Sequence, residues 1–193
     1  MALAHLGVTV EISDLDTEDS VEAKVMRRFY TQARQQTLRD FDWHFARKKA
    51  ALGLIDTDTT REFLYAYTYP ADCLHFRRVL SDYRNDAPDT RVPFELKHGT
   101  SATEIWTDRS SAYGEYTVDV TPNSGRMTAD CIMALSYRLA AFAAPALTRG
   151  DPFQLQNRVM TFYQFELAKA EANSNNEAAP DPQPDAEMHR GRG

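Results

Sequence analysis

Cysteine is scarce in this sequence. Cys73 and Cys131 are the two cysteines among 193 residues, and no Cys-x-x-Cys spacing is present. This count excludes a disulfide-rich scaffold and a cysteine-pair redox or zinc motif. We therefore expect both cysteines to be small apolar core residues of a protein that folds in a reducing compartment.

Long apolar runs are also missing. The longest, residues 139–147, is too short to span a bilayer and contains Pro145. The first 14 residues contain neither a basic segment nor a long apolar segment, which predicts that no signal peptide is present. We expect a protein made in the cytoplasm, with no membrane segment.

Positive charge is in deficit, because 22 lysines and arginines stand against 28 aspartates and glutamates, for a net charge of −6. This balance argues against a general nucleic-acid binder, since such a protein needs a basic surface. A protein that encloses DNA without gripping it remains compatible with this charge. Hydrophobic residues make up 42% of the chain, which predicts a packed core in one domain, or in one domain with an inserted lobe.

Motifs of catalysis and of cofactor binding are absent. The five histidines show no His-Glu-x-x-His or other metal-ligand spacing, and no Gly-x-Gly-x-x-Gly, Walker or Gly-x-Ser-x-Gly pattern occurs. His44, between two aromatic residues, is expected to be structural. Glu104, Asp108 and Glu115 could pair as acid and base, but charged residues in hairpins are usually solvated. We expect no enzyme, no cofactor and no metal.

Helical periodicity appears in both halves of the chain. A short helix over 2–7 is expected to stop at Gly7, and a long helix is expected over 16–41. Candidate N-caps of the long helix are Thr17, Asp19 and Ser20, and its apolar stripe comprises Val21, Val25, Phe29 and Ala33.

Two further helices are expected after residue 126. The first has an apolar face of Ile132, Leu135, Leu139 and Phe142, and Pro145 should kink or end it. The second starts with Asp151 as N-cap and Pro152 at the first helical position. Its apolar face comprises Leu155, Val159 and Phe162.

Short aromatic and β-branched segments fill the middle of the chain. They are "REFLYAYTYP", "LHFRRVL", "VPFELKHG", "TEIWTD" and "EYTVDVTP", separated by turn residues, and this pattern predicts β-strands. The order predicts an α+β fold, in which N- and C-terminal helices form one bundle around a β-rich insertion. We place the boundaries at 1–60, 61–121, 122–172 and 173–193, the last being an extended C-terminal arm.

The predicted arm is polar, rich in proline and almost free of apolar anchors. Such a composition cannot form a core of its own, so we expect the arm to become ordered on another chain.

A succession of segments carries a family resemblance. Leu6 and Gly7 are followed by Trp43, Phe45 and Ala46 in "WHFARKKAAL", by Tyr69, Pro70, Asp72 and Cys73 in "YPADC", and by Leu139 and Ala140 in the late helix. In this order, over most of residues 2–172, the sequence resembles the tail tubular protein A and head-to-tail adaptor (connector) family of tailed bacteriophages. Each motif is short, and the ordered succession gives the resemblance its weight.

The resemblance implies a structural virion protein. Members of that family form a dodecameric ring beneath the portal protein and join the head to the tail, and viral DNA passes through the ring. It implies a virion location at the neck, with the portal and a tail nozzle or tail-tube component as partners. It also implies that the arm docks on the portal, with its prolines stiffening an extended form and Met188 filling a pocket. The arm residues singled out are Pro180, Pro182, Pro184, Met188, Arg190 and Arg192.

Under the same resemblance, Trp43 and Phe45, and Tyr69 and Pro70, are structural anchors. Arg47, Lys48 and Lys49 then emerge at a subunit interface and meet acidic groups of a neighbour, although a solvated basic turn explains them equally well. Two other functions stay open: a tail-associated enzyme that degrades cell wall, and a small cytosolic binding module.

Overall fold

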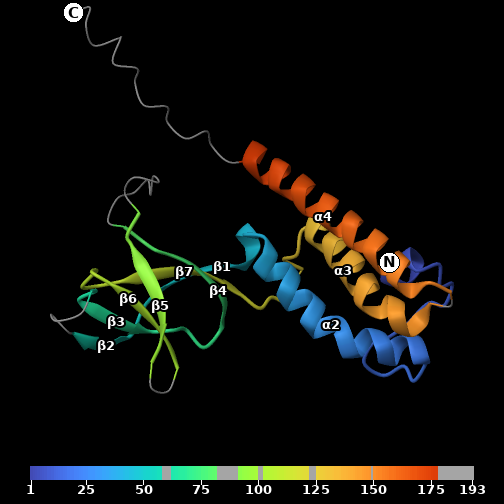
Figure 1. Cartoon of the computed structure of the whole chain (residues 1–193), viewed down its shortest axis with the longest axis horizontal. Helices are drawn as coiled ribbons and strands as arrows, with labels where there is room; N and C mark the ends of the chain where they lie inside the picture. Colours follow the sequence, from blue (N-terminus) through green and yellow to red (C-terminus); the bar gives the residue numbers. More distant parts are fainter. Residues whose placement is uncertain (58–61, 82–90, 100–101, 122–124, 149, 178–193) are drawn as a thin grey trace, which may run out of the picture.

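A computed structural model of the chain describes residues 1–57, 62–81, 91–99, 102–121, 125–148 and 150–177. In Figure 1 the helices gather in one half of the molecule and the strands in the other. The helices are α1 (Ala2–His5), α2 (Val21–Asp40), α3 (Ala129–Leu147) and α4 (Pro152–Glu177), with a 3-10 turn at His44–Ala46. The strands are β1 (Arg47–Ala51), β2 (Leu54–Thr57), β3 (Tyr65–Thr68), β4 (Cys73–Val79), β5 (Phe94–His98), β6 (Thr103–Thr107) and β7 (Tyr113–Val118). The predicted α+β class is confirmed.

Helix α3 is the centre of the helical half, and it contacts α1, α2 and α4. Its small residues make this possible, because Ala140, Ala141, Ala143 and Ala144 are fully buried and let the neighbouring helices approach closely. Helix α3 is also long and apolar enough to cross a membrane, but 56% of that apolar window is buried inside the protein. Helix packing therefore accounts for its apolar character.

The helix ends agree with the sequence prediction in part, because the helix expected over 16–41 begins only at Val21 and ends at Asp40. Ser20 caps α2 by accepting a hydrogen bond from the Ala23 amide, so of the three candidate caps Ser20 has the role. Asp151 accepts hydrogen bonds from the first amides of α4, and Pro152 is its first residue, as predicted. Gly7 follows α1 with a positive φ of 73°, which suits a glycine at a helix end. Helix α3 continues past Pro145 to Leu147, so the proline does not end the helix where it stands.

The predicted apolar stripes are partly wrong. Val21, Ile132 and Phe162 are 65%, 43% and 44% exposed, because each helix packs through a neighbouring part of its circumference. In α2 the buried side chains include Met26 and Leu38 in addition to the predicted Ala33. In α3 and α4 the predicted Leu135, Leu139 and Val159 are buried, and Leu155 is partly buried against them.

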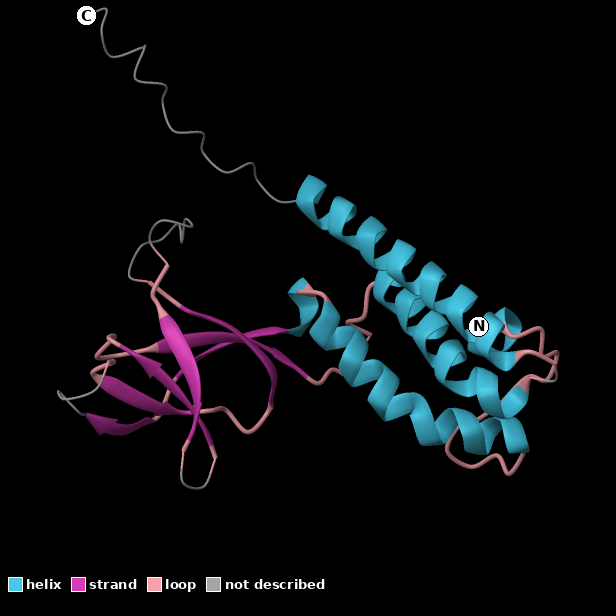
Figure 2. Cartoon of the chain, viewed as in Figure 1, coloured by secondary structure: helices cyan, strands magenta, loops and turns pink. Residues whose placement is uncertain are grey.

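The strands form two antiparallel sheets. Sheet A has the order β1-β7-β4, and sheet B has the order β2-β3-β6-β5. Figure 2 shows that they lie together at the end opposite the helices. A core of Leu52, Tyr67, Phe76, Val79, Ile105, Ala112 and Tyr116 contains side chains from both sheets. Each of the five predicted β-segments overlaps one strand, and β4 and β7 begin one and two residues before their predicted segments.

Two predicted boundaries differ from the structure. Strands β1 and β2 precede residue 61, so the β-rich part begins at Arg47. Residues 173–177 continue α4 and do not belong to an extended arm. The prediction places residues 47–60 in the helical half and residues 173–177 in the polar arm, whereas strand pairing and helix propagation extend into them.

Candidate interaction surface

The stretch that joins the helical half to the sheets is anchored by aromatic residues. Trp43 and Phe45 are 3% and 8% exposed and belong to a core that also contains Leu38, Cys131 and Ala170. The Trp43 indole nitrogen donates to the carbonyl oxygen of Thr37 at 2.9 Å. Burial raises the pKa of the Cys131 thiol to about 12, as expected of an unreactive core cysteine.

Of the other two predicted anchors, Tyr69 lies in a different core. Tyr69 packs against Phe76 between the sheets, with ring centroids 6.3 Å apart. Burial raises its pKa to about 12. Pro70 is half-buried, and its carbonyl oxygen accepts a hydrogen bond from the Cys73 amide. Trp43 and Phe45 therefore serve one core and Tyr69 another, whereas Pro70 belongs to neither.

The three predicted interface cations lie on or at the start of edge strand β1, and each has an acidic partner within the chain. Arg47 pairs with Asp42 at 3.0 Å. Lys48 pairs with Asp72 at 2.5 Å, and Lys49 pairs with Glu115 at 3.1 Å. The Lys49 pair follows from sheet register, since Lys49 is directly opposite Glu115 on β7. The role of these cations at a subunit interface stays a prediction, and any acidic neighbour would have to compete with these partners.

Glu115 is the buried centre of this charge pattern. It is 2% exposed and bonds both Lys49 and Arg78, the latter at 3.2 Å. Burial by itself raises the pKa of Glu115, but the hydrogen bonds from Arg78 and Lys49 outweigh burial and hold the pKa below its ordinary value. Glu115 is therefore a charged structural residue and is unsuited to act as a general acid near neutral pH.

Two arginines fix helix α2 to the sheets. Arg77 of β4 donates to the carbonyl oxygens of Leu38, Arg39 and Phe41 at the end of α2, at 3.4, 3.2 and 2.9 Å. It thereby satisfies carbonyls that lack partners within the helix, and its charge suits the negative end of the helix dipole. Arg34 forms a two-pronged ion pair with Asp119, at 2.9 and 2.8 Å. These contacts tie helix α2 to the β-rich half.

Sequence reasoning missed a third arginine. Arg138 of α3 is 8% exposed and bonds Asp40 of α2, and its guanidinium lies 4.3 Å from the ring centroid of Tyr163. Burial, and the hydrogen bond that Tyr163 donates to Asp40, raise the pKa of that tyrosine. A single arginine in the apolar run "MALSYRLAAFAA" was the available signal, because a buried charge requires a partner.

The carboxylates proposed for catalysis do not come together. Glu104 lies in sheet B, where it accepts a hydrogen bond from the Trp106 indole, whereas Glu115 lies in sheet A. Asp108 accepts from the backbone amide of Leu64. His44 is exposed and contacts Phe45 edge-on. Within the described ranges, no group of three or more histidine, cysteine, aspartate or glutamate residues is placed to hold a metal ion.

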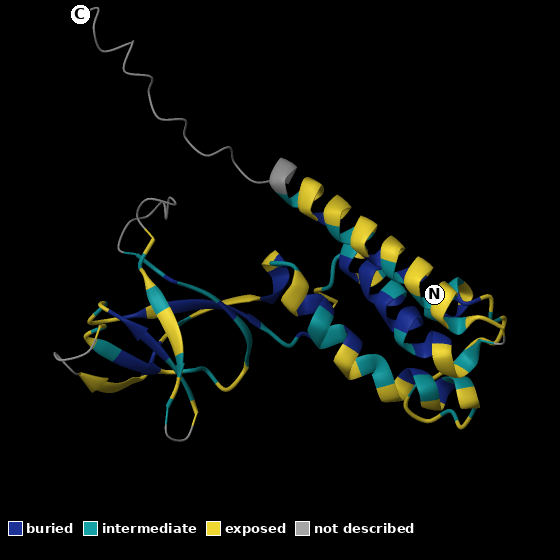
Figure 3. Cartoon of the chain, viewed as in Figure 1, coloured by how far each residue is buried: buried dark blue, intermediate teal, exposed yellow. Residues whose placement is uncertain are grey.

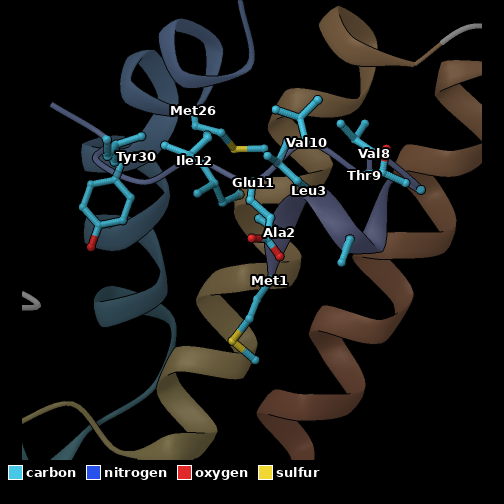
Figure 4. Close-up of a pocket in the computed structure, with 14 residues that line it drawn as sticks. Met1, Ala2, Leu3, Val8, Thr9, Val10, Glu11, Ile12, Met26 and Tyr30 are labelled. Carbon is cyan, nitrogen blue, oxygen red and sulfur yellow. The ribbon is translucent and has the colours of Figure 1, made fainter. Parts of the chain in front are cut away.

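The helical half carries a hollow of about 820 Å³. Figure 4 shows it between α1, the following segment 8–12, and Met26 and Tyr30 of α2. Its lining is largely aliphatic, with Glu11 as the charged member. An apolar side chain would suit such a surface, whereas polar catalysis would need convergent polar groups that this lining does not provide.

The six predicted arm residues, Pro180, Pro182, Pro184, Met188, Arg190 and Arg192, lie outside the described residues. No protein-family model matches the chain, and a search of curated proteins finds no similar sequence.

Proposed function

We propose that the protein is a head-to-tail adaptor of a tailed bacteriophage, a non-enzymatic virion protein that forms a ring beneath the portal. The observation that carries the proposal is the ordered resemblance from Leu6 to Ala140. Several residues that carry the resemblance are buried in the core. Trp43, Phe45 and Ala46 are buried at the joint, and Leu139 and Ala140 are buried in α3. A shared framework of core positions is a basis for a shared fold.

The architecture is a second observation that supports the adaptor proposal. An adaptor must contact different partners at its two ends, and the two ends must be held in a fixed position relative to each other. The helical half and the sheets have separate cores, and the arginine contacts of Arg34 and Arg77 hold them together. On this view the helices form the ring's bundle, the β-rich lobe projects toward a tail nozzle or tail-tube component, and the C-terminal arm reaches the portal.

Charge fits passage of DNA. With a net charge of −6 per copy, a ring of identical copies would be acidic as a whole, and the three cations of β1 already have acidic partners. An acidic or neutral lumen avoids holding the DNA backbone, whereas a basic one would slow ejection. The proposal includes no sequence-specific contact with DNA.

The decisive experiment is to locate the chain in purified particles. We expect cryo-electron microscopy of the neck to show a closed ring of this chain, with twelve copies as the resemblance implies, seated between portal and tail. Its absence from particles would favour the small binding module. Cell-wall degradation by the purified protein, lost in Glu104→Gln or Glu115→Gln, would favour the enzyme.

A further inference from the structure

One apolar row crosses sheet B from edge to edge. The strand register places Leu54 opposite Tyr67, Tyr67 opposite Ile105, and Ile105 opposite Leu96. Directly opposite residues in antiparallel strands point to the same face, so the row is continuous on one side of the sheet. Tyr67 and Ile105 are 1% and 0% exposed and belong to the core between the sheets.

The residues at the two ends of this row are exposed, and no strand within the described part of the chain covers them. Leu54 on edge strand β2 is 52% exposed, and Leu96 on edge strand β5 is 45% exposed. Figure 3 shows β2 exposed along its length at the lower left of the sheets. Among the residues that the structure describes, no named strand pairs with the outer side of β2 or β5, although Val92, two residues before β5, forms an isolated bridge with Val79 of β4. Unpaired strand edges are templates for another strand.

Strand direction makes the two edges complementary. Three successive antiparallel pairings separate β2 from β5, so the two edge strands run in opposite directions. A second copy in the same orientation therefore presents its β2 antiparallel to β5 of the first. With Leu54 opposite Leu96, the apolar row of one copy continues into that of the next.

Charges permit this register. Lys97, the cation of the β5 edge, lies with its ammonium 5.3 Å from the Trp106 ring centroid and 3.1 Å from Glu95. Both charged residues alternate with Leu96 along the strand and therefore lie on the other face. The paired rows place Glu95, Trp106, Ala66 and Asp56 next to one another across the sheet, so Glu95 of one copy lies beside Asp56 of the next. Lys97, which pairs with Glu95, offsets this repulsion. Ile55, which has no partner in β3 at the shift in the β2 register, is 50% exposed.

We propose that sheet B is shared between neighbouring copies of this chain, with β5 of one copy paired antiparallel to β2 of the next so that Leu96 covers Leu54. The contact is head-to-tail, and repetition of such a contact closes into a ring where the rotation allows it. It would be one of the subunit contacts of the proposed adaptor ring, and to that extent it rests on the proposed function.

The test measures assembly of the full-length protein by sedimentation over a concentration series. We expect the wild type to form species larger than the monomer, and Leu54→Glu and Leu96→Glu each to abolish them. The variant that combines Leu54→Glu with Leu96→Lys should restore them, because the new charges face each other across the contact. The matched control is Val21→Glu on α2, at an exposed apolar site in the helical half, and it should assemble like the wild type.

Folding is checked separately, because each glutamate replaces a half-exposed leucine and should leave the unfolding temperature nearly unchanged. If either glutamate variant fails to fold, cysteine cross-linking decides. The chain with both Leu54→Cys and Leu96→Cys should form a ladder of oxidised oligomers that the wild type and each single variant lack.

A wild type that stays monomeric throughout, or assembly that survives either folded glutamate variant, overturns the shared sheet. If Leu54→Glu abolishes assembly and Leu96→Glu does not, the proposal is also overturned, because the contact would then be β2 of one copy paired with β2 of another. The adaptor proposal is tested separately, in purified particles. If the ring is still present in particles that carry Leu54→Glu, the shared sheet is wrong and the adaptor proposal is unaffected. If the chain is absent from particles, the adaptor proposal is wrong. Sedimentation in solution still decides whether the sheet contact forms.

Discussion

Tyr163 of α4 donates a hydrogen bond of 2.7 Å to the carboxylate of Asp40 at the end of α2. The same carboxylate oxygen pairs with Arg138 of α3. One acidic side chain thus joins the three long helices, and Gln36 gives Arg138 a further acceptor at 3.1 Å.

Asp40→Ala should destabilise the protein, because it leaves the buried Arg138 without its anion and Tyr163 without its acceptor. We expect the free energy of unfolding in urea to fall by about 2–3 kcal/mol, discounted because Asp40 is partly exposed. The double variant Asp40→Ala with Arg138→Met should lose less than the sum of its single changes, since no unpaired charge remains buried. Strict additivity would contradict the coupling. Asp19→Ala, which breaks the exposed pair with Lys24, serves as the control and should leave stability unchanged.

Stability should fall in acid, and Glu115 should contribute to the fall. Its pKa is lower in the folded protein than its ordinary value of 4.5, so the stability it contributes is complete above that value. The contribution is lost as pH falls through the folded pKa, when the carboxylate is protonated. Urea unfolding between pH 7 and pH 3 should show a weaker pH dependence below pH 5 for Glu115→Gln than for the wild type. Equal slopes in the two proteins would show that Glu115 does not drive the effect.

Gly114 of β7 has no room for a side chain. A Cβ placed there would lie 2.6 Å from the Phe76 ring and 3.0 Å from Leu52, and both of these residues belong to the core between the sheets. Gly114→Ala should therefore cost about 1–3 kcal/mol of unfolding free energy through overpacking. Gly53→Ala is the control, because its nearest atom would lie at an ordinary 3.6 Å. Equal stability of the two variants would contradict the packing argument.

Removal of residues 178–193 should separate folding from docking. Helix α4 extends to Glu177, so truncation after that residue should leave the unfolding temperature unchanged. Under the proposed function, the shortened protein should fail to join portal-bearing heads, as measured by its occupancy in purified particles. Undiminished occupancy would show that the arm is not the docking element. Truncation after Ala172 is less suitable, because it also removes the hydrogen bond from Asn173 to Asp130.

Local patterns were enough to predict the long helices and five of the strands of this fold, but not β1 and β2. Ser20, Gly7 and the Asp151-Pro152 pair act on their immediate neighbours in the chain, so helix ends follow from short-range chemistry. Alternation of aromatic and β-branched residues located five strands for the same reason. Burial of Trp43 and Phe45 was predictable as well, because large aromatic side chains next to a helix end gain most from a core.

Only the tertiary structure decided which side chains that are distant in the sequence pair with each other. Lys49 and Glu115 are far apart in sequence and meet because β1 pairs with β7 in one register. Arg138 finds Asp40 because α3 packs against α2. The exposure of Val21, Ile132 and Phe162 depends on which part of each helix its neighbours cover. Hydrophobic periodicity states that a helix has an apolar face, but the angle at which two helices meet selects the residues that are buried.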